Sequence, residues 1–298
     1  MDKKVKTTVI GSYPAVFDNM VFMDDYFNQN ESSWNKIIDY AVDDMVEAGV
    51  DIISDGQTRD PFLVIYARKL KGCRIRDRIE VVDKVRYNGS ITVDDQIYVK
   101  KRLPKNKELV GLIAGPYTLA KSCVDMYYND TKELAFDFAG ALSEEAKNIQ
   151  KYVDMVSIDE PFFSVEMPDY AEDLITIITK GLSRPTRLHV CGDVSNIISK
   201  IVEIPVDILS HEFKASPELF KSFKDISFPQ EICLGSVRSD HPKVETIDEI
   251  TVHIQNGINV FDDKICQLSP DCGLRNLPRD IAFKKLKNLV KAGEKIYG

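Results

Sequence analysis

Eight apolar segments alternate with stretches of helical periodicity along the chain, and this alternation limits the possible folds more than any other feature. The apolar segments are predicted strands at 7–10, 50–54, 109–114, 153–158, 186–191, 206–210, 231–235 and 264–268. Strands that each lead into a helix form parallel sheets, and eight such units close into a barrel. We therefore predict the α/β class and a (β/α)8 TIM barrel. The alternative, an open doubly wound sheet, is disfavoured because no glycine-rich phosphate loop follows the first strand.

The helical segments are expected at 33–48, 61–70, 117–151, 169–181, 194–202, 217–224, 246–256 and 279–296. One stretch breaks the rhythm, because two apolar runs flank Asn88-Gly89, a strong signal for a two-residue turn. We interpret 79–102 as an inserted β-hairpin and 15–31 as an irregular loop. Since no linker or low-complexity segment occurs, residues 1–298 are expected to form one domain.

Composition excludes several classes of protein. The net charge of −8 argues against a nucleic-acid surface, so no nucleic-acid partner is expected. No run of about 18 apolar residues occurs, so we expect no membrane span. The first residues lack the apolar segment of a signal peptide, which predicts a cytoplasmic protein. In that reducing compartment the 6 cysteines are expected to be free thiols or metal ligands.

Polar residues gather where the predicted strands end, which in a barrel is the edge that carries active sites. They are Ser12, Asp55, Gln57, Asp159, Glu160, His189, Cys191, His211, Glu212 and Cys272. His189 and Cys191 are two apart, so they share one face of their strand. The sixth and eighth strands end on the same side of the mouth and add a carboxylate and a thiol.

This set of ligand types suits zinc (Zn²⁺), and we predict a site made by His189, Cys191, Glu212 and Cys272. Either Glu212 or its neighbour His211 could be the metal ligand at the end of the sixth strand. Glu212 is favoured, because turning it inward also turns Ser210 inward and Leu209 outward toward the helices. A carboxylate ligand indicates a replaceable position and therefore a catalytic metal.

A divalent ion bound by two thiolates and a carboxylate forms a site with a net negative charge. Such a site is poor at generating hydroxide but suits the activation of a substrate thiol, whose pKa the ion lowers from about 8.5. The expected chemistry is alkylation at sulfur.

Several segments, in order, resemble the catalytic domain of cobalamin-independent methionine synthase. They are 7–14 (TTVIGSYP), 50–57, 157–161 (SIDEP), 188–191 (LHVC), 211–212 and 269–274 (SPDCGL). The resemblance implies a methyltransferase of methionine biosynthesis, with zinc on the four residues above and homocysteine held beside the metal. It further implies that Ile10, Gly11 and Ser12 hold the substrate carboxylate through backbone groups, and that Asp159 holds the amino group.

Three departures from the family pattern are informative. Gln57 stands where the family has a glutamate that contacts the amino group, so Asp159 is left as the charged partner. The proton-donating histidine of the family has no exact counterpart, because it aligns with Asp240, beside His241. Asp159 and His241 are the candidate catalytic residues. The chain also resembles the short "core" enzymes that lack the additional folate-binding domain, and this implies a methylated corrinoid protein as methyl donor.

Two other functions stay open from the sequence. The stretch 189–193 (HVCGD) also resembles zinc methyltransferases that methylate coenzyme M from corrinoid proteins. Asp159 argues against that acceptor, because a sulfonate is better bound by cations. The other alternative is a decarboxylase-type barrel without zinc. The metal content of the purified protein distinguishes it from a zinc methyltransferase.

Overall fold

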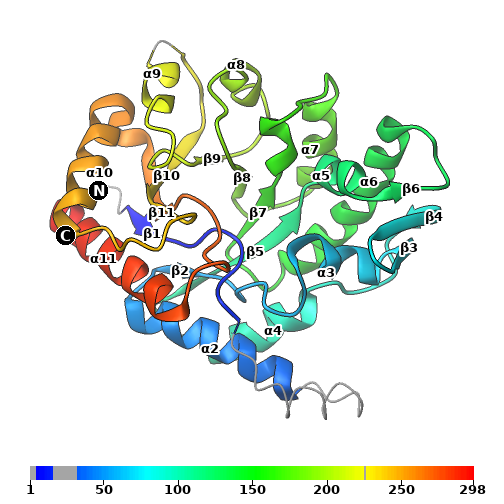
Figure 1. Ribbon diagram of the computed structural model, residues 1–298, viewed down its shortest axis with the longest axis horizontal. Helices are drawn as coiled ribbons and strands as arrows, with labels where there is room; N and C mark the ends of the chain where they lie inside the picture. Colours follow the sequence, from blue (N-terminus) through cyan, green and yellow to red (C-terminus); the bar gives the residue numbers. More distant parts are fainter. Residues whose placement is uncertain (1–4, 16–31, 225) are drawn as a thin grey trace.

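The computed structural model describes residues 5–15, 32–224 and 226–298, and Figure 1 shows their arrangement. The loop expected at 15–31 lies outside the described residues from residue 16 onward.

Eight parallel strands form the centre of the molecule, as predicted. They are β1 (Lys6–Thr7), β2 (Ile52–Ile53), β5 (Glu108–Ala114), β7 (Met155–Asp159), β8 (Thr186–Val190), β9 (Ile208–His211), β10 (Glu231–Val237) and β11 (Ile265–Pro270). Their order in the sheet is β1-β11-β10-β9-β8-β7-β5-β2. A parallel bridge between Thr8 and Ile52 joins the two ends of this order and closes the barrel.

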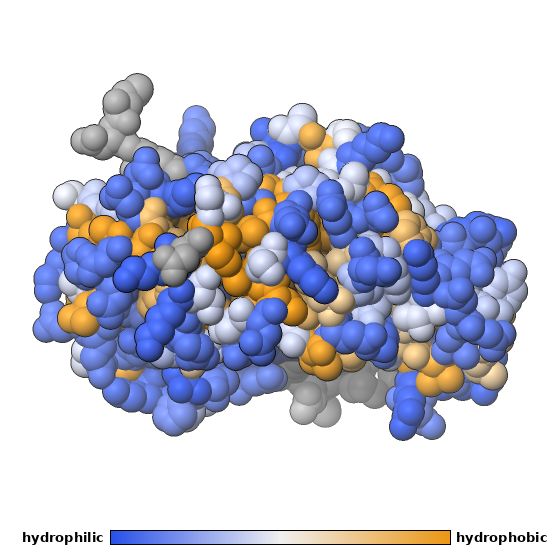
Figure 2. Space-filling view, turned by 90° about the horizontal axis from the view of Figure 1, so that it is seen from above, coloured by the Kyte–Doolittle hydropathy of each residue, from blue (hydrophilic) through white to orange (hydrophobic). Residues whose placement is uncertain are grey.

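Helices surround the strands (Figure 1). They are α2 (Ser32–Ala48), α3 (Phe62–Lys69), α4 (Val93–Arg102), α5 (Pro116–Ser122), α6 (Thr131–Ile149), α7 (Ala171–Thr179), α8 (Ile198–Ile201), α9 (Leu219–Phe223), α10 (Ile247–Phe261) and α11 (Arg279–Tyr297), with 3-10 turns η1 (Pro161–Ser164) and η2 (Asp262–Lys264). Hydrophilic residues cover most of the face in Figure 2, with apolar side chains visible between them. Among the described residues, no helix is both long and apolar enough to cross a membrane.

The core has two layers, because side chains alternate between the two faces of each strand. The larger layer lies between strands and helices, and the smaller layer fills the barrel interior. Along β9, Ile208 belongs to the interior and Leu209 to the outer layer. This alternation decides which polar residues near the strand ends can meet over the barrel axis.

The inserted hairpin is present, but its predicted position at 79–102 is wrong. Its arms are β3 (Lys71–Ile75) and β4 (Ile79–Arg86), joined at 76–78, and β6 (Val124–Asp125) adds a third strand beside β4. Asn88-Gly89 lies in the loop before α4 rather than in the hairpin turn. The reason is a long-range contact: the buried Glu145 carboxylate of α6 accepts the backbone N–H groups of Ile91 and Thr92, which fixes the start of α4.

The helix expected at 117–151 is interrupted. α5 ends at Ser122, and β6 intervenes before α6 begins. Asp130 caps α6, because its side chain accepts the backbone N–H groups of Lys132 and Glu133. The helix expected at 194–202 is reduced to the single turn of α8.

Candidate metal and substrate site

Three of the four predicted zinc ligands converge at the mouth of the barrel. His189 Nε2 lies 3.0 Å from Cys191 Sγ, which lies 2.8 Å from Cys272 Sγ. The three ligand atoms all lie within 4.8 Å of one another. His189 and Cys191 come from β8 and its end, whereas Cys272 follows β11, so barrel closure brings together residues 81 positions apart. One imidazole and two thiols at this spacing form a ligand set that zinc favours.

The protonation state of His189 suits metal binding. Burial, with a further effect from Arg187, lowers its pKa well below the ordinary value, so the imidazole is neutral at pH 7. Its Nδ1 lies 3.1 Å from Ser210 Oγ. With Nδ1–H donating to this hydroxyl, the lone pair of Nε2 faces the thiols.

Cys191 is a protonated thiol in this arrangement. A hydrogen bond with Cys272 raises its pKa well above the ordinary value, and burial adds to the effect. A metal ion between the sulfurs would favour the thiolates instead.

Glu212 lies near this group but not within it. Its half-buried carboxylate accepts the backbone N–H of Gly192 and is near enough to contribute to the raised pKa of Cys191. The predicted alternation of side chains along the sixth barrel strand, β9, is present. Ser210 reaches His189, whereas the ring of His211 packs against Phe213 and Phe223. The structure therefore turns His211 away from the cluster and leaves Glu212 as the candidate fourth ligand.

The predicted substrate residues form a second group beside the thiols. Gly11 has a φ of 56°, and a Cβ there would lie 3.3 Å from Gln57 Oε1 and 3.6 Å from Asp159 Oδ2. Gly11 therefore lies directly against an amide and a carboxylate, and we refer to Gly11, Gln57 and Asp159 as the cradle. Gln57 Nε2 is buried and has no hydrogen-bond partner among the described residues, so it is available to a ligand.

Contacts between loops join the cradle to the thiol group. The backbone N–H of Leu274 donates to Ser12 O at 2.7 Å, and Gly273 packs directly on Ser12. Ile10 belongs to the interior cluster against which Cys272 packs. The predicted carboxylate-binding segment, 10–12, is thus in contact with the loop that carries the third metal-ligand candidate.

Asp159 lies at the end of β7 with its carboxylate buried. Burial raises its pKa to about 6, while the Arg187 guanidinium and a hydrogen bond from Ser157 act in the opposite direction. The next residue, Glu160, turns to the other side and accepts the backbone N–H groups of Tyr117 and Thr118. Glu160 therefore holds the first turn of α5 and is not available to a substrate.

His241 is not part of either group. It is exposed, and its Nδ1 accepts the backbone N–H of Lys243 at 3.0 Å. The neighbouring Asp240 is paired with Arg238. Together with Lys214 and Arg238, His241 lines a separate hollow of about 320 Å³.

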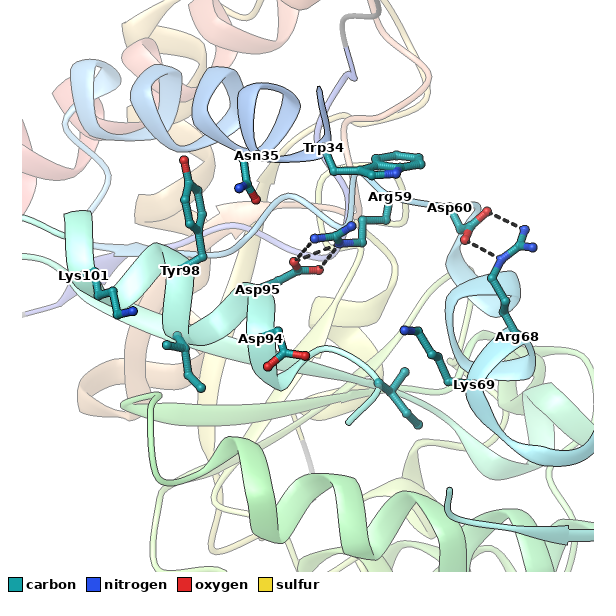
Figure 3. Close-up of a pocket in the computed structure, with 12 residues that line it drawn as sticks. Trp34, Asn35, Arg59, Asp60, Arg68, Lys69, Asp94, Asp95, Tyr98 and Lys101 are labelled. Carbon is teal, nitrogen blue, oxygen red and sulfur yellow. Dashed lines mark hydrogen bonds and ion pairs between the residues drawn. The ribbon is translucent and has the colours of Figure 1, made fainter. Parts of the chain in front are cut away.

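A second hollow, larger than the one at His241, also lies apart from the thiols. It has a volume of about 670 Å³ and is bounded by α2, α3 and α4 (Figure 3). Arg59 and Asp95 form a two-point ion pair in its wall, and the adjacent Gln96 donates to Asp55 at 3.0 Å. Gln96 thus connects α4 to the cradle, since Asp55 in turn accepts the backbone N–H of Gln57.

The sequence did not predict a role for Arg187, which contacts Ser157, and it turned Ser210 inward without predicting its contact with His189. The signal was available: Arg187 is two residues before His189, so strand alternation turns a charged side chain into the barrel.

An α/β barrel with an imidazole and two thiols gathered at the carboxyl ends of its strands defines a class of barrel enzymes with a candidate metal site at the mouth. The family model for the catalytic domain of cobalamin-independent synthases matches residues 5–295. The chain therefore belongs to the cobalamin-independent methionine synthase family, a family of methyltransferases.

Similar proteins agree with this membership. Methionine synthases of Methanocaldococcus jannaschii and Methanothermobacter marburgensis are 38% and 35% identical to this chain, each over 96% of it and over 97% and 98% of their own lengths. A B12-independent methionine synthase from Shewanella sp. W3-18-1, solved with selenomethionine, shares the fold with a TM-score of 0.84. That alignment covers 98% of this chain and 97% of the other at 22% identity.

Proposed function

We propose that this protein transfers a methyl group to the thiol of homocysteine, forming methionine, with zinc held by His189, Cys191, Cys272 and Glu212. The observation that carries the proposal is the contact between a thiol–imidazole group and a cradle for the polar end of an amino acid. Family membership supports the same reaction. Because the groups involved come from strands spread along the chain, we also propose that residues 1–298 act as one catalytic domain.

Zinc, when bound, would lower the pKa of the substrate thiol and keep the thiolate nucleophilic. The chain's own residues hold the rest of the substrate. Asp159 accepts the ammonium N–H groups, Gln57 supplies a neutral polar contact, and the backbone of 10–12 donates to the carboxylate. These contacts place the sulfur over the cluster and lower the entropic cost of the transfer.

The methyl donor proposed from the sequence is a methylated corrinoid protein. The family's description as cobalamin-independent does not support this donor, so a methylated folate is the competitor. The two donors differ in their need for a proton. A corrinoid leaves with the electron pair of the broken carbon–cobalt bond, whereas a folate amine is protonated as it leaves. We therefore expect His241→Ala to retain transfer from methylcobalamin, and retention with methylcobalamin but loss with methylfolate would assign proton donation to His241.

The test is a methyl-transfer assay with zinc-loaded protein, in which homocysteine is compared with coenzyme M. We expect methionine by mass spectrometry, lost in Cys272→Ser and retained in Cys123→Ser, a thiol outside the cluster. Transfer to coenzyme M alone would contradict the acceptor and the role of Asp159. Protein that takes up no zinc would favour a decarboxylase-type barrel.

A further inference from the structure

Arg187 is a fully buried cation at the centre of the barrel. It lies in β8 on the same face as His189, one layer below the thiol–imidazole group. Its side chain reaches four neighbouring segments rather than the solvent. A buried guanidinium is costly unless its hydrogen bonds and its charge are both satisfied, so its position demands a reason.

Only neutral groups hydrogen-bond to this guanidinium among the described residues. Nε donates to Ser157 Oγ at 3.1 Å, one terminal nitrogen donates to Gln267 Oε1 at 3.1 Å, and the other donates to Val9 O at 3.1 Å. The Sγ of Cys233 lies 3.8 Å from the first terminal nitrogen. Among the described residues, no carboxylate therefore pairs directly with Arg187, and a neutral group connects its charge to the nearest carboxylate.

Ser157 is that neutral group. Its hydroxyl accepts from Arg187 and has one hydrogen to donate, which is directed to Asp159 Oδ1 at 3.2 Å. The opposite end of the guanidinium holds the carbonyl of Val9, two residues before Gly11. One side chain thus holds both walls of the cradle, the Asp159 carboxylate through Ser157 and the 10–12 backbone through Val9.

We propose that Arg187 is a positioning residue for the amino-acid end of the substrate, which fixes Asp159 relative to the 10–12 backbone without touching the substrate itself. This inference rests on the proposed function, because it assumes that the cradle receives an ammonium and a carboxylate. It predicts that Arg187 governs selectivity for the amino group and does not merely support the barrel.

The test measures, by calorimetry on zinc-loaded protein, the affinities of homocysteine and 4-mercaptobutanoate, which is homocysteine without its amino group. Arg187→Met, Arg187→Lys, Ser157→Ala and the double variant Arg187→Met/Ser157→Ala are compared with the wild type. In Arg187→Met we expect the ratio of the two affinities to fall about 10-fold to 100-fold, the usual loss when a group that orients a ligand contact is removed. Arg187→Lys should recover part of this ratio, because it restores the charge.

Ser157→Ala keeps the buried cation and removes only the link, so it tests the inference even if Arg187→Met does not fold. The affinity ratio of the double variant should be no lower than that of Arg187→Met, because both substitutions break the same connection. An equal loss for both thiols, or an unchanged ratio in both Arg187→Met and Ser157→Ala, would overturn the inference while leaving the proposed function intact. Wild-type protein that binds homocysteine no more tightly than 4-mercaptobutanoate would overturn the proposed function and the inference together.

Discussion

At the scale of single residues, the mouth of the barrel contains carboxyl groups held away from water. Asp55 is one of them, and its oxygens accept hydrogen bonds from the backbone N–H of Gln57 and the side-chain amide of Gln96. Burial, with the nearby Asp95, raises the pKa of Asp55 to about 6. A residue that supports a polar site in this way carries an energetic cost when it ionises.

We predict that Asp55→Asn stabilises the protein at neutral pH. An acid whose pKa is higher in the folded state holds a proton that the unfolded chain releases, so the contribution of Asp55 to stability is most favourable below about pH 4 and becomes less favourable as pH rises to about 6. The shift from 3.8 to about 6 is equivalent to about 3 kcal/mol. Gln96 Oε1 has no partner among the described residues, so a turned amide would accept from the new asparagine.

The measurement is urea unfolding of both proteins at pH 4, 5, 6 and 7. The difference in unfolding free energy should grow in favour of Asp55→Asn with pH, and the exposed control Asp43→Asn should show no such growth. A constant difference across this range would contradict the assigned burial effect.

Glu212 provides a second prediction at this scale, on metal affinity. If its carboxylate is the fourth ligand, Glu212→Gln weakens zinc binding about 10-fold or more, because a neutral amide oxygen is a poorer zinc ligand than a carboxylate. Competition with a chromophoric chelator measures the change. Glu166→Gln, an exposed carboxylate paired with Lys121, is the matched control. Equal zinc affinity in the two variants would remove Glu212 from the ligand set.

At the scale of elements, the start of α4 depends on a residue 53 positions away. The Glu145 carboxylate accepts from the backbone of Ile91 and Thr92 and from the hydroxyls of Thr92 and Tyr87. This contact converts a segment that resembles a hairpin arm into the beginning of a helix. Local sequence could not reveal it, because the turn signal at Asn88-Gly89 is genuine and the contact that overrides it comes from another helix.

We expect Glu145→Ala to lower the unfolding free energy by about 3 kcal/mol, since two buried backbone N–H groups lose their acceptor. The adjacent Glu144→Ala should cost less than about 0.5 kcal/mol, because Glu144 is exposed and its ion pair is with Lys147 on the surface. Denaturant unfolding compares the two. Similar losses in both would mean that α4 starts without help from α6.

At the scale of the whole molecule, the barrel was predictable and its details were not. Eight alternating units define the topology. Strand alternation was enough to place His189 and Cys191 on one face and to turn Ser210 inward, and barrel closure brought Cys272 to them. The same rule turns Arg187 inward, yet its role depends on Val9, Ser157 and Gln267, which only barrel closure brings near. His241 failed to join the site because a position in a loop, unlike one on a strand, is fixed by no periodic rule.

The short first strand has a consequence for how the protein is made. β1 pairs with β11, joining Lys6 to Gln267, which are 261 positions apart. Most of the chain must therefore leave the ribosome before the last seam can form, and until then Ser12 and Gly273 are not in contact. Until this pairing forms, the chain would expose unpaired strand edges, so chaperones would be needed most at this stage. The candidate metal site and the candidate substrate site would then be completed by one seam, because the loop after β11 takes part in both.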